Sequence, residues 1–572
     1  MSQRGWPDTS RFSIGLVTTT VVWLRADLVA GLAVAALVVP KSLGYAGIAG
    51  VPIQHGLYAA AAGTIIYALF GTAKQISTGP SSALAAVAGS AVLVASVSDE
   101  DAVTLVSAIT IMTGLLFLVL AVLKMGWISN FLSKAVITGF LFGAAIEVVV
   151  GELPKLTGTE IDGTNAWRKF GSWLGSLGDT DGATLVLGLI SLVVIVAIRF
   201  SPTKIPGALV LVVGGLIASF AFGLEDRGIA LVGEVPRGLV APALPDLGFV
   251  VDNFATIGSA SLGLLLIGFS QTAGDARAFA SKHGYRIDVN QESVAQGMSN
   301  LGSGMFQGIP VSTSLSASSL NDESGAKTPV ASLTTGVLIV LTLLILAPLF
   351  SDLPKAVLAA LIIDAVVFGM MDVAEMKRLR LVARVDFWIA VAAILGVLSA
   401  GVLAGVIIGV VLSLGWLVYI AVNPRMPVLG RRPGTQVFRS LDNYPDGESY
   451  PGLLVLRFDA GLFFATSDAL EDRLRELAQD ADPRFDTVVI SFEGVDFIDS
   501  QGADKLAELL DLAEAYGAEL RLARVKPDVL DLLDRAGVLE RLGDDKIFGN
   551  VYNAVEDALP EAARRDSTTS TA

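Results

Sequence analysis

The sequence predicts a polytopic α-helical membrane protein followed by a small α/β domain. Three observations support this fold class: 53% of the 572 residues are hydrophobic, only 17% are charged, and the charge is unevenly distributed. A soluble globular protein carries roughly 25% charged residues. Residues 425–572 hold 17 Lys and Arg against 29 Asp and Glu, whereas residues 1–424 are nearly neutral. A long apolar part therefore precedes a short acidic one.

Apolar runs that could cross a bilayer recur as far as residue 422. A spanning helix needs about 20 apolar residues, and counting the runs that Gly and Ser interrupt gives about 14 crossings. The expected spans lie near 28–50, 52–70, 80–96, 102–123, 131–150, 183–198, 205–224, 254–272, 288–306, 310–321, 328–350, 354–371, 385–399 and 401–422. We therefore expect a transmembrane domain over residues 27–424.

Basic residues indicate the orientation of these spans. Lys and Arg collect in cytoplasmic loops. With an even number of spans, Arg25, Arg199 with Lys204, and Arg425 all fall on one side. We therefore expect a multi-pass protein of the inner (plasma) membrane with both termini in the cytoplasm. The flanking parts are then a cytoplasmic N-terminal segment (1–26), a linker (425–452), a folded domain (453–560) and a disordered tail (561–572).

Composition excludes several kinds of site. The chain has no Cys, which excludes disulfides, thiolate metal sites and Cys nucleophiles. Two histidines, His55 and His283, leave almost no material for a zinc site. A net charge of -15 without a basic stripe argues against nucleic-acid binding. We expect no cofactor, no metal ion, no nucleic-acid partner and no enzyme activity.

Two segments are too polar and too punctuated for ordinary spans. Residues 77–84 (STGPSSAL) and 308–316 (GIPVSTSLS) each place a Pro before small hydroxyl residues and an apolar helical stretch. Since Pro is tolerated in a first helical turn, each segment predicts a half-helix that begins inside the membrane. Paired broken segments indicate an inverted-repeat transporter with a site at the midplane. The alternative is that small residues only let the spans pack closely.

The expected site favours a negative solute. A helix N-terminus offers unpaired N–H groups and about half a positive charge. Two such ends facing one another would hold a small anion without a metal ion.

Several motifs resemble the SulP family, the sulfate-permease-like anion transporters that include the prestin-type proteins. They are residues 25–32 (RADLVAGL), 39–46 (VPKSLGYA) and 288–292 (DVNQE), and residues 453–560 resemble the STAS domain of the same family. The resemblance implies two inverted seven-span repeats, divided into core and gate domains as in the uracil-permease-like fold. It also implies a homodimer that moves a small anion by alternating access, with a cytoplasmic protein as a possible partner of the STAS domain.

Three positions depart from the family pattern. The chain has Lys41 where the family usually has Gln, Gln271 where it often has an acid for sodium or proton coupling, and Ala317 where it often has Arg. A lysine inside a span costs about 2.5–3.5 kcal/mol and normally faces a partner or a wet cavity. We expect Lys41 to supply the fixed positive charge of the site, the alternative being that it reaches the membrane interface. Because Gln271 carries no full negative charge, we expect no sodium site.

The residues expected to bind the anion are Lys41, Tyr45, Ser81, Ser82, Gln271, Ser314, Leu315 and Ser316. Tyr45 lies one helical turn beyond Lys41 on the same face. Asp364 and Asp275 are candidates for coupling because intramembrane acids often carry protons. The alternatives are structural roles. Asp364 would then pair with another residue of the membrane domain, and Asp275 would form an ion pair with Arg277 or Lys282.

These residues predict a secondary active transporter, a symporter, for a small inorganic or carboxylate anion such as sulfate or bicarbonate. The alternatives are a nucleobase permease of the same fold, an anion channel, and a signalling protein whose spans only anchor the acidic domain.

The acidic C-terminal part alternates strands and helices. Short β-rich runs lie near 453–458 and 488–492, and amphipathic helical stretches follow at 467–479, 502–516 and 526–537. This alternation predicts an α/β sheet. Residues 496–502 (DFIDSQG) resemble the STAS signature turn, with Gln501 where related anti-sigma-factor antagonists carry a phosphorylated hydroxyl. Ser500 could be modified instead, but a helix cap is the favoured role.

Overall fold

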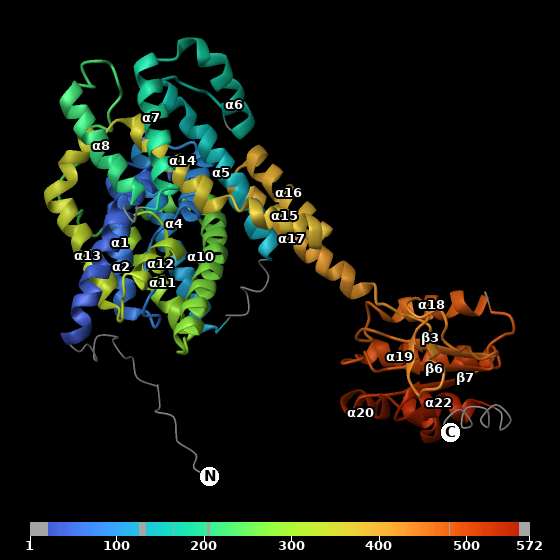
Figure 1. Ribbon diagram of the computed structural model, residues 1–572. Helices are drawn as coiled ribbons and strands as arrows, with labels where there is room; N and C mark the ends of the chain where they lie inside the picture. Colours follow the sequence, from blue (N-terminus) through green and yellow to red (C-terminus); the bar gives the residue numbers. More distant parts are fainter. Residues whose placement is uncertain (1–20, 125–132, 164, 203–205, 480, 560–572) are drawn as a thin grey trace. The chain divides into compact units, whose positions relative to one another are not determined.

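The computed structural model describes residues 21–124, 133–163, 165–202, 206–479 and 481–559 (Figure 1). The chain divides into two units, and the boundary follows Ser413, inside the last helix of the apolar part. Residues 1–20 of the predicted N-terminal segment, Lys204 and the predicted disordered tail lie outside the described residues.

Helices lie at each of the predicted spans of the first unit. They are α1 (Val21–Ile48), α2 (Gln54–Phe70), α3 (Ser82–Ala95), α4 (Asp99–Val122), α5 (Lys134–Thr157), α7 (Gly182–Arg199), α8 (Gly207–Phe222), α10 (Phe254–His283), α11 (Val289–Met305), α12 (Leu315–Glu323), α13 (Val330–Leu341), α14 (Lys355–Met370), α16 (Arg384–Ala400) and α17 (Val402–Val422). Among the described residues, 8 helical stretches are long and apolar enough to cross a membrane by length and composition. The others are the shorter segments, several of them interrupted by Gly or Ser.

Smaller helices join these segments. They are α6 (Ala166–Gly175), η2 (Ser176–Asp179), α9 (Leu247–Asp252), η3 (Thr342–Leu346), η4 (Ala347–Asp352) and α15 (Val373–Val382). The stretch predicted as one span near 328–350 is therefore α13 continued by η3 and η4.

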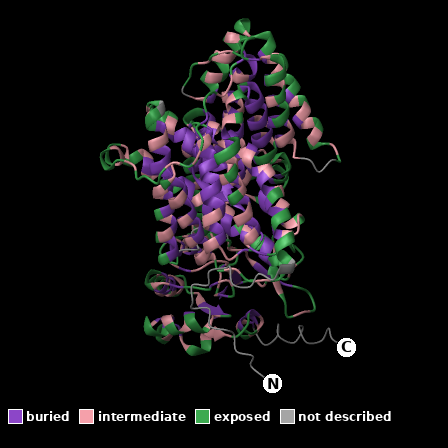
Figure 2. Ribbon diagram, turned by 90° about the vertical axis from the view of Figure 1, so that its left-hand side faces the viewer, coloured by how far each residue is buried: buried purple, intermediate pink, exposed green. Residues whose placement is uncertain are grey.

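The two halves of the apolar unit interleave. Helix α1 packs against α13 and α2, α4 packs against α11, and α5 packs against α14 and α16. Figure 2 shows buried residues along the middle of the bundle and exposed residues on its outer faces. Large apolar side chains such as Phe220 (93% exposed) and Val122 (79% exposed) lie on those outer faces. Such an apolar surface suits contact with lipid rather than water.

The second unit contains a parallel sheet of four strands. In spatial order they are β5 (Leu453–Arg457), β6 (Thr487–Ser491), β7 (Glu519–Ala523) and β8 (Ile547–Phe548). The helices are α18 (Ser467–Gln479), α19 (Ser500–Ala515), α20 (Pro527–Arg535), α21 (Val538–Leu542) and α22 (Val551–Ala558), with the short η5 (Asp544–Lys546) before β8. Buried apolar residues of the strands and of α18 to α21 form one cluster, and other strand residues form a second cluster with α22. The α/β alternation predicted from the sequence is thus present.

Two details of this unit differ from the predictions. Residues 425–452 are not a simple linker, because β3 (Leu429–Arg431) and β4 (Phe438–Ser440) form an antiparallel hairpin. Leu429 is buried in a cluster with Val455 and Val489, so burial of apolar side chains attaches this segment to the sheet. The cap of α19 is Asp499, whose Oδ1 accepts from the Gly502 N–H at 2.8 Å, rather than Ser500.

Glu292 of α11 ties that helix to the loop between α2 and the first broken segment. Its carboxylate is buried and accepts from the Tyr67 O–H at 2.5 Å, the Thr72 N–H at 2.8 Å and the Ala73 N–H at 3.1 Å. The Thr72 hydroxyl donates to it as well. Four donors therefore depend on one acceptor group.

Replacing this acceptor by an amide tests that dependence. In Glu292→Gln, an NH₂ group takes the place of one carboxylate oxygen and leaves buried donors unpaired, at about 1–3 kcal/mol each. We expect a clearly lower Tm for the purified protein in detergent. Glu323→Gln, on the exposed end of α12, should keep the wild-type Tm. Equal Tm values for Glu292→Gln and the wild type would contradict this role of Glu292.

Candidate functional site

The two broken segments meet in the structure. Strand β1 (Thr78–Pro80) pairs antiparallel with β2 (Val311–Thr313), and Pro80 lies opposite Val311. Each strand leads into a half-helix, β1 into α3 and β2 into α12. The prolines do not occupy first helical turns as predicted, because Pro80 lies in β1 and Pro310 directly precedes β2. The half-helices themselves begin where the hydroxyl residues follow.

Helix α11 holds both strands in place. Asn300 accepts from the Val311 N–H at 3.0 Å and donates to the Val311 carbonyl at 2.9 Å. Gln296 donates to the Thr78 hydroxyl at 3.0 Å, and both side chains are fully buried. These residues were not predicted as part of the site. Their spacing could have indicated a shared role, since Glu292, Gln296 and Asn300 recur every four residues and share one helix face.

Ser81 and Ser314, both predicted to bind the anion, are the N-caps of the half-helices. The Ser81 hydroxyl accepts from the Leu84 N–H at 3.4 Å, and the Ser314 hydroxyl accepts from the Ala317 N–H at 3.4 Å. The N–H groups of the residues next to the caps, Ser82 and Leu315 among them, have no preceding helical carbonyl to donate to. Both helix ends therefore offer unpaired donors beside the ladder.

Lys41 reaches this place from α1. Its Nζ donates to the Ser316 hydroxyl at 3.2 Å, and the Ser316 hydroxyl lies 3.4 Å from that of Ser314. The lysine thus points to the second half-helix rather than to the membrane interface. Leu315 is 57% exposed, so one side of this helix end is open.

A small cavity lies between Lys41 and the helix ends. Its volume is about 10 Å³, which holds about one water molecule. Its walls come from α1 and the two broken segments: Leu37, Val38, Lys41, Ser42, Tyr45, Ser77, Gly79, Pro80, Ser314 and Ala317. The Tyr45 side chain also interacts with that of Ser82. The structure thus brings together Lys41, Tyr45, Ser81, Ser82, Ser314 and Ser316.

Gln271 and Asp275 lie one turn apart on α10 and support β2. The Ser312 hydroxyl donates to Gln271 Oε1 at 2.8 Å, and the Thr313 hydroxyl donates to Asp275 Oδ2 at 2.8 Å. The ion pair considered for Asp275 does not form with Lys282, which pairs with Asp322 at 2.6 Å instead. Neither Gln271 nor Asp275 lines the small cavity.

Asp364 of α14 is held by Arg199. The guanidinium donates from Nε to Oδ1 at 2.8 Å and from Nη2 to Oδ2 at 2.5 Å. Arg199 was predicted to lie in a loop, but it is the last residue of α7 and stacks over Phe368 at 4.4 Å. Both charges act on Lys41. The site therefore has an ion pair as a neighbour that the loop assignment of Arg199 did not predict.

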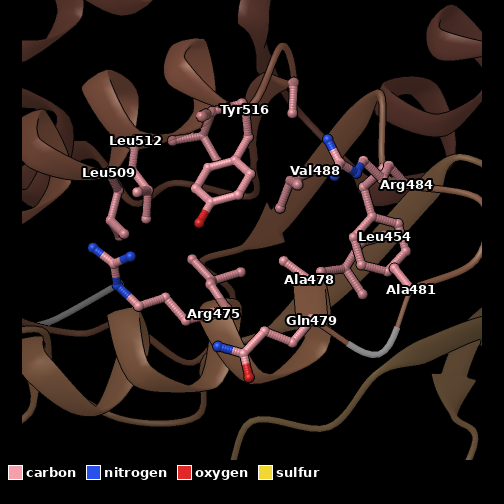
Figure 3. A pocket seen from close by; sticks show the side chains of 15 residues that line it. Leu454, Arg475, Ala478, Gln479, Ala481, Arg484, Val488, Leu509, Leu512 and Tyr516 are labelled. Atoms are coloured by element: carbon pink, nitrogen blue, oxygen red, sulfur yellow. The ribbon is translucent and has the colours of Figure 1, made fainter.

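The second unit has a larger cavity of its own, about 470 Å³ (Figure 3). Leu509, Leu512 and Tyr516 form one wall, and Arg475 and Arg484 lie on opposite sides of it in this view. Its described lining residues include no acid and no histidine. Over the described residues of the whole chain, no group of three or more potential metal ligands occurs.

Two family models match the chain. The sulfate permease family matches residues 24–393, and the STAS domain matches residues 444–558. The first match covers more than half of the chain.

Similar proteins match along nearly the whole length. A probable sulfate transporter of Mycobacterium tuberculosis is 30% identical over 535 residues, which cover 93% of this chain and 95% of the relative. Solute carrier family 26 member 10 of Mus musculus is 31% identical over 571 residues, covering 94% and 84%. Sulfate transporter 4.1, chloroplastic, of Arabidopsis thaliana is 29% identical over 562 residues, covering 94% and 80%.

Solved structures share the fold. Murine solute carrier 26 family member A9, an anion transporter in the inward-facing state, has a TM-score of 0.85 at 23% identity, covering 95% of this chain and 92% of that one. The transmembrane domain of a cyanobacterium bicarbonate transporter has a TM-score of 0.59 at 22% identity, covering 69% and 99%. The predicted fold class, a polytopic helical membrane protein with a STAS domain, is confirmed. The chain belongs to the sulfate permease family and carries a C-terminal STAS domain.

Proposed function

We propose that the protein is a secondary active transporter that moves a small inorganic or carboxylate anion by alternating access. One observation carries the proposal: the β1–β2 ladder joins two half-helices whose N-terminal ends lie beside Lys41, 3.2 Å from Ser316. Each helix end contributes about half a positive charge, and Lys41 adds a full one. No carboxylate is among the described residues that line the small cavity.

Several features favour an anion over the nucleobase alternative. Three positive groups converge on one cavity, and Asp364, the nearby acid, is already neutralised by Arg199. A neutral base would leave the half-buried Lys41 ammonium without a counter-charge inside a span, which is costly. The relatives named as sulfate transporters, and the bicarbonate transporter of similar fold, make sulfate and bicarbonate the first candidates.

The size of the cavity favours a carrier over a channel. A volume of about 10 Å³ cannot pass an anion without movement. An anion can enter only if the residues that line this cavity move, which is consistent with a carrier that changes conformation. Membership in a family of transporters supports the expectation that the protein is not an enzyme.

The assembly and placement expected from the sequence form part of this proposal. They are a homodimer in the plasma membrane, cytoplasmic termini, and a cytoplasmic protein partner for the STAS domain. The 470 Å³ cavity of the second unit supports the expected protein partner only in that it offers room for an inserted side chain.

Uptake by proteoliposomes tests the substrate class. Radiolabelled sulfate, bicarbonate, chloride, nitrate, a dicarboxylate and uracil would be offered with and without proton and sodium gradients. We expect saturable uptake of at least one anion and none of uracil. Because Gln271 offers no negative charge, a sodium gradient should not change the rate. Uptake of uracil alone, or anion flux that does not saturate, would contradict the carrier proposed here.

Lys41→Gln tests the fixed charge. A hydrogen bond to a charged group contributes about 1.5–3 kcal/mol, and each 1.4 kcal/mol corresponds to a factor of ten. We expect kcat/KM for anion uptake to fall about 10- to 100-fold with an unchanged Tm. Lys355→Gln, at the exposed start of α14, is the matched control and should transport normally. Wild-type uptake by Lys41→Gln would remove Lys41 from the mechanism.

A further inference from the structure

A second cavity lies next to the small one along the same two helices. Helix α1 lines the first cavity with Lys41 and Tyr45 and the second with Gly47 and Ile48, and Gly50, just beyond the end of α1, lines the second as well. Helix α3 starts beside the first cavity and lines the second with residues of its later turns, from Ala86 to Leu93. Because a helical turn rises 5.4 Å, the second cavity begins about one turn beyond the first.

The second cavity is large enough for a small anion, and it is narrow where α1 meets α3. Its volume is about 210 Å³. A Cβ placed on Gly89 of α3 would lie 2.1 Å from the Ile48 carbonyl oxygen of α1. Small residues permit such close approach of two helices. The second cavity therefore follows the small cavity along a closely packed pair of helices.

Two buried carboxylates of α5 form the opposite wall. Glu147 is 8% exposed and Glu152 is 4% exposed. Glu152 pairs through Oε1 with Lys155 at 2.7 Å. Glu147 has no partner for Oε2 among the described residues, and neither has Oε2 of Glu152. An ionised carboxylate that lacks hydrogen-bond donors has a high free-energy cost when it is buried in a membrane domain, and binding a proton removes this cost.

Few other charges face Glu147. The charged residues that line its cavity are Glu152, Lys155 and, from α6, Lys169, whose charge acts on Glu147. The lining residues from α1, α3 and α17 are uncharged. Charges on the other helices packed against α5 are those of Lys355 and Asp364 on α14, Arg199 on α7, Glu375, Lys377, Arg378 and Arg380 on α15, and Arg384 and Asp386 on α16. Of these, Asp364 is paired with Arg199, and Glu375 is paired with Arg378 and Lys134.

We propose that Glu147 is the proton-binding site that couples anion movement to proton movement. The inference rests on the proposed function as an anion carrier. An anion that passes through the second cavity is repelled by ionised Glu147 and not by its protonated form. Proton and anion therefore cross this cavity together, which makes the carrier a proton–anion symporter.

Glu147 suits this role better than the two acids predicted from the sequence. Both carboxylate oxygens of Asp364 accept hydrogen bonds from the Arg199 guanidinium. Asp275 accepts a hydrogen bond from Thr313 and supports the ladder. A hard cation is a poor occupant beside Glu147, because it takes about six or more oxygen ligands and the cavity offers two carboxylates.

Glu147→Gln tests the proposal in proteoliposomes. The probe is radiolabelled sulfate, or whichever anion of the panel the wild type takes up. We expect an inward proton gradient to raise wild-type uptake several-fold, and Glu147→Gln to lose this response while still exchanging internal for external anion. Glu160→Gln, on an exposed residue just after α5, should respond like the wild type. The proposal is overturned if Glu147→Gln keeps the full response, if only a sodium gradient drives uptake, or if Asp275→Asn or Asp364→Asn alone removes the response.

An infrared measurement separates this site from the transport activity. In purified wild-type protein, the band of a buried protonated carboxyl should appear as the pH is lowered; it should be missing in Glu147→Gln and present in Glu160→Gln. Glu147→Asp keeps a carboxyl group and should therefore retain the band with a shifted pH midpoint. This variant replaces Glu147→Gln in the test if the Gln variant does not fold. A wild type that transports no anion contradicts the proposed function, whereas a pH-dependent band that is unchanged in Glu147→Gln contradicts the proton site.

Discussion

An antiparallel ladder of three residue pairs, formed inside the apolar unit, is the constraint on which the site depends. Backbone N–H and C=O groups have no water to bond with in a bilayer, so non-helical segments there must find partners in the protein. Strands β1 and β2 pair through their backbones, and the Asn300 side chain forms hydrogen bonds with both the N–H and the carbonyl group of Val311. The same pairing sets the two half-helix ends side by side. Satisfying the backbone and bringing the two half-helix ends together are therefore one structural solution.

Charged groups of the apolar unit are arranged in three ways. Asp364 and Arg199 neutralise one another, with the guanidinium also stacked on Phe368. Within the part of the chain that the structure describes, Lys41 forms one hydrogen bond, to the Ser316 hydroxyl, which leaves its charge available to a solute. Glu147 keeps an oxygen unbonded within the described residues. A protein seldom retains charges in a membrane without a use for them, because each is costly. Lys41 and Glu147 are therefore the groups that we propose to act on the solute and the proton, whereas the Asp364–Arg199 pair has a structural role.

Much of the site was predictable because its signals are local. A Pro followed by Ser and Thr in an apolar setting indicates a broken span wherever it occurs, and two such segments at matching positions indicate a repeat. A lysine eight apolar residues into a span indicates a buried charge. The residues that hold the β1–β2 ladder and the neighbouring ion pair were harder to predict. Gln296 and Asn300 could be placed on one face of α11, but nothing local says which backbone that face meets. Arg199 was assigned to a loop because the ranges of adjacent helices were not known.

The sequence by itself determined the main helices of the apolar unit, the two interrupted segments and the α/β character of the second unit. The limits of several helices differed; α10, for example, was expected over 254–272 and extends from Phe254 to His283. Periodicity, turn residues and charge act over a few neighbouring positions, so they can be read along the chain. Only the tertiary structure decided that Pro80 faces Val311, that Asp364 binds Arg199, that residues 425–452 join the sheet, and that Glu147 lines a cavity one helical turn beyond the small cavity at Lys41. These are contacts between residues far apart in the chain, and they exist only once the packing of helices and strands has selected which faces meet.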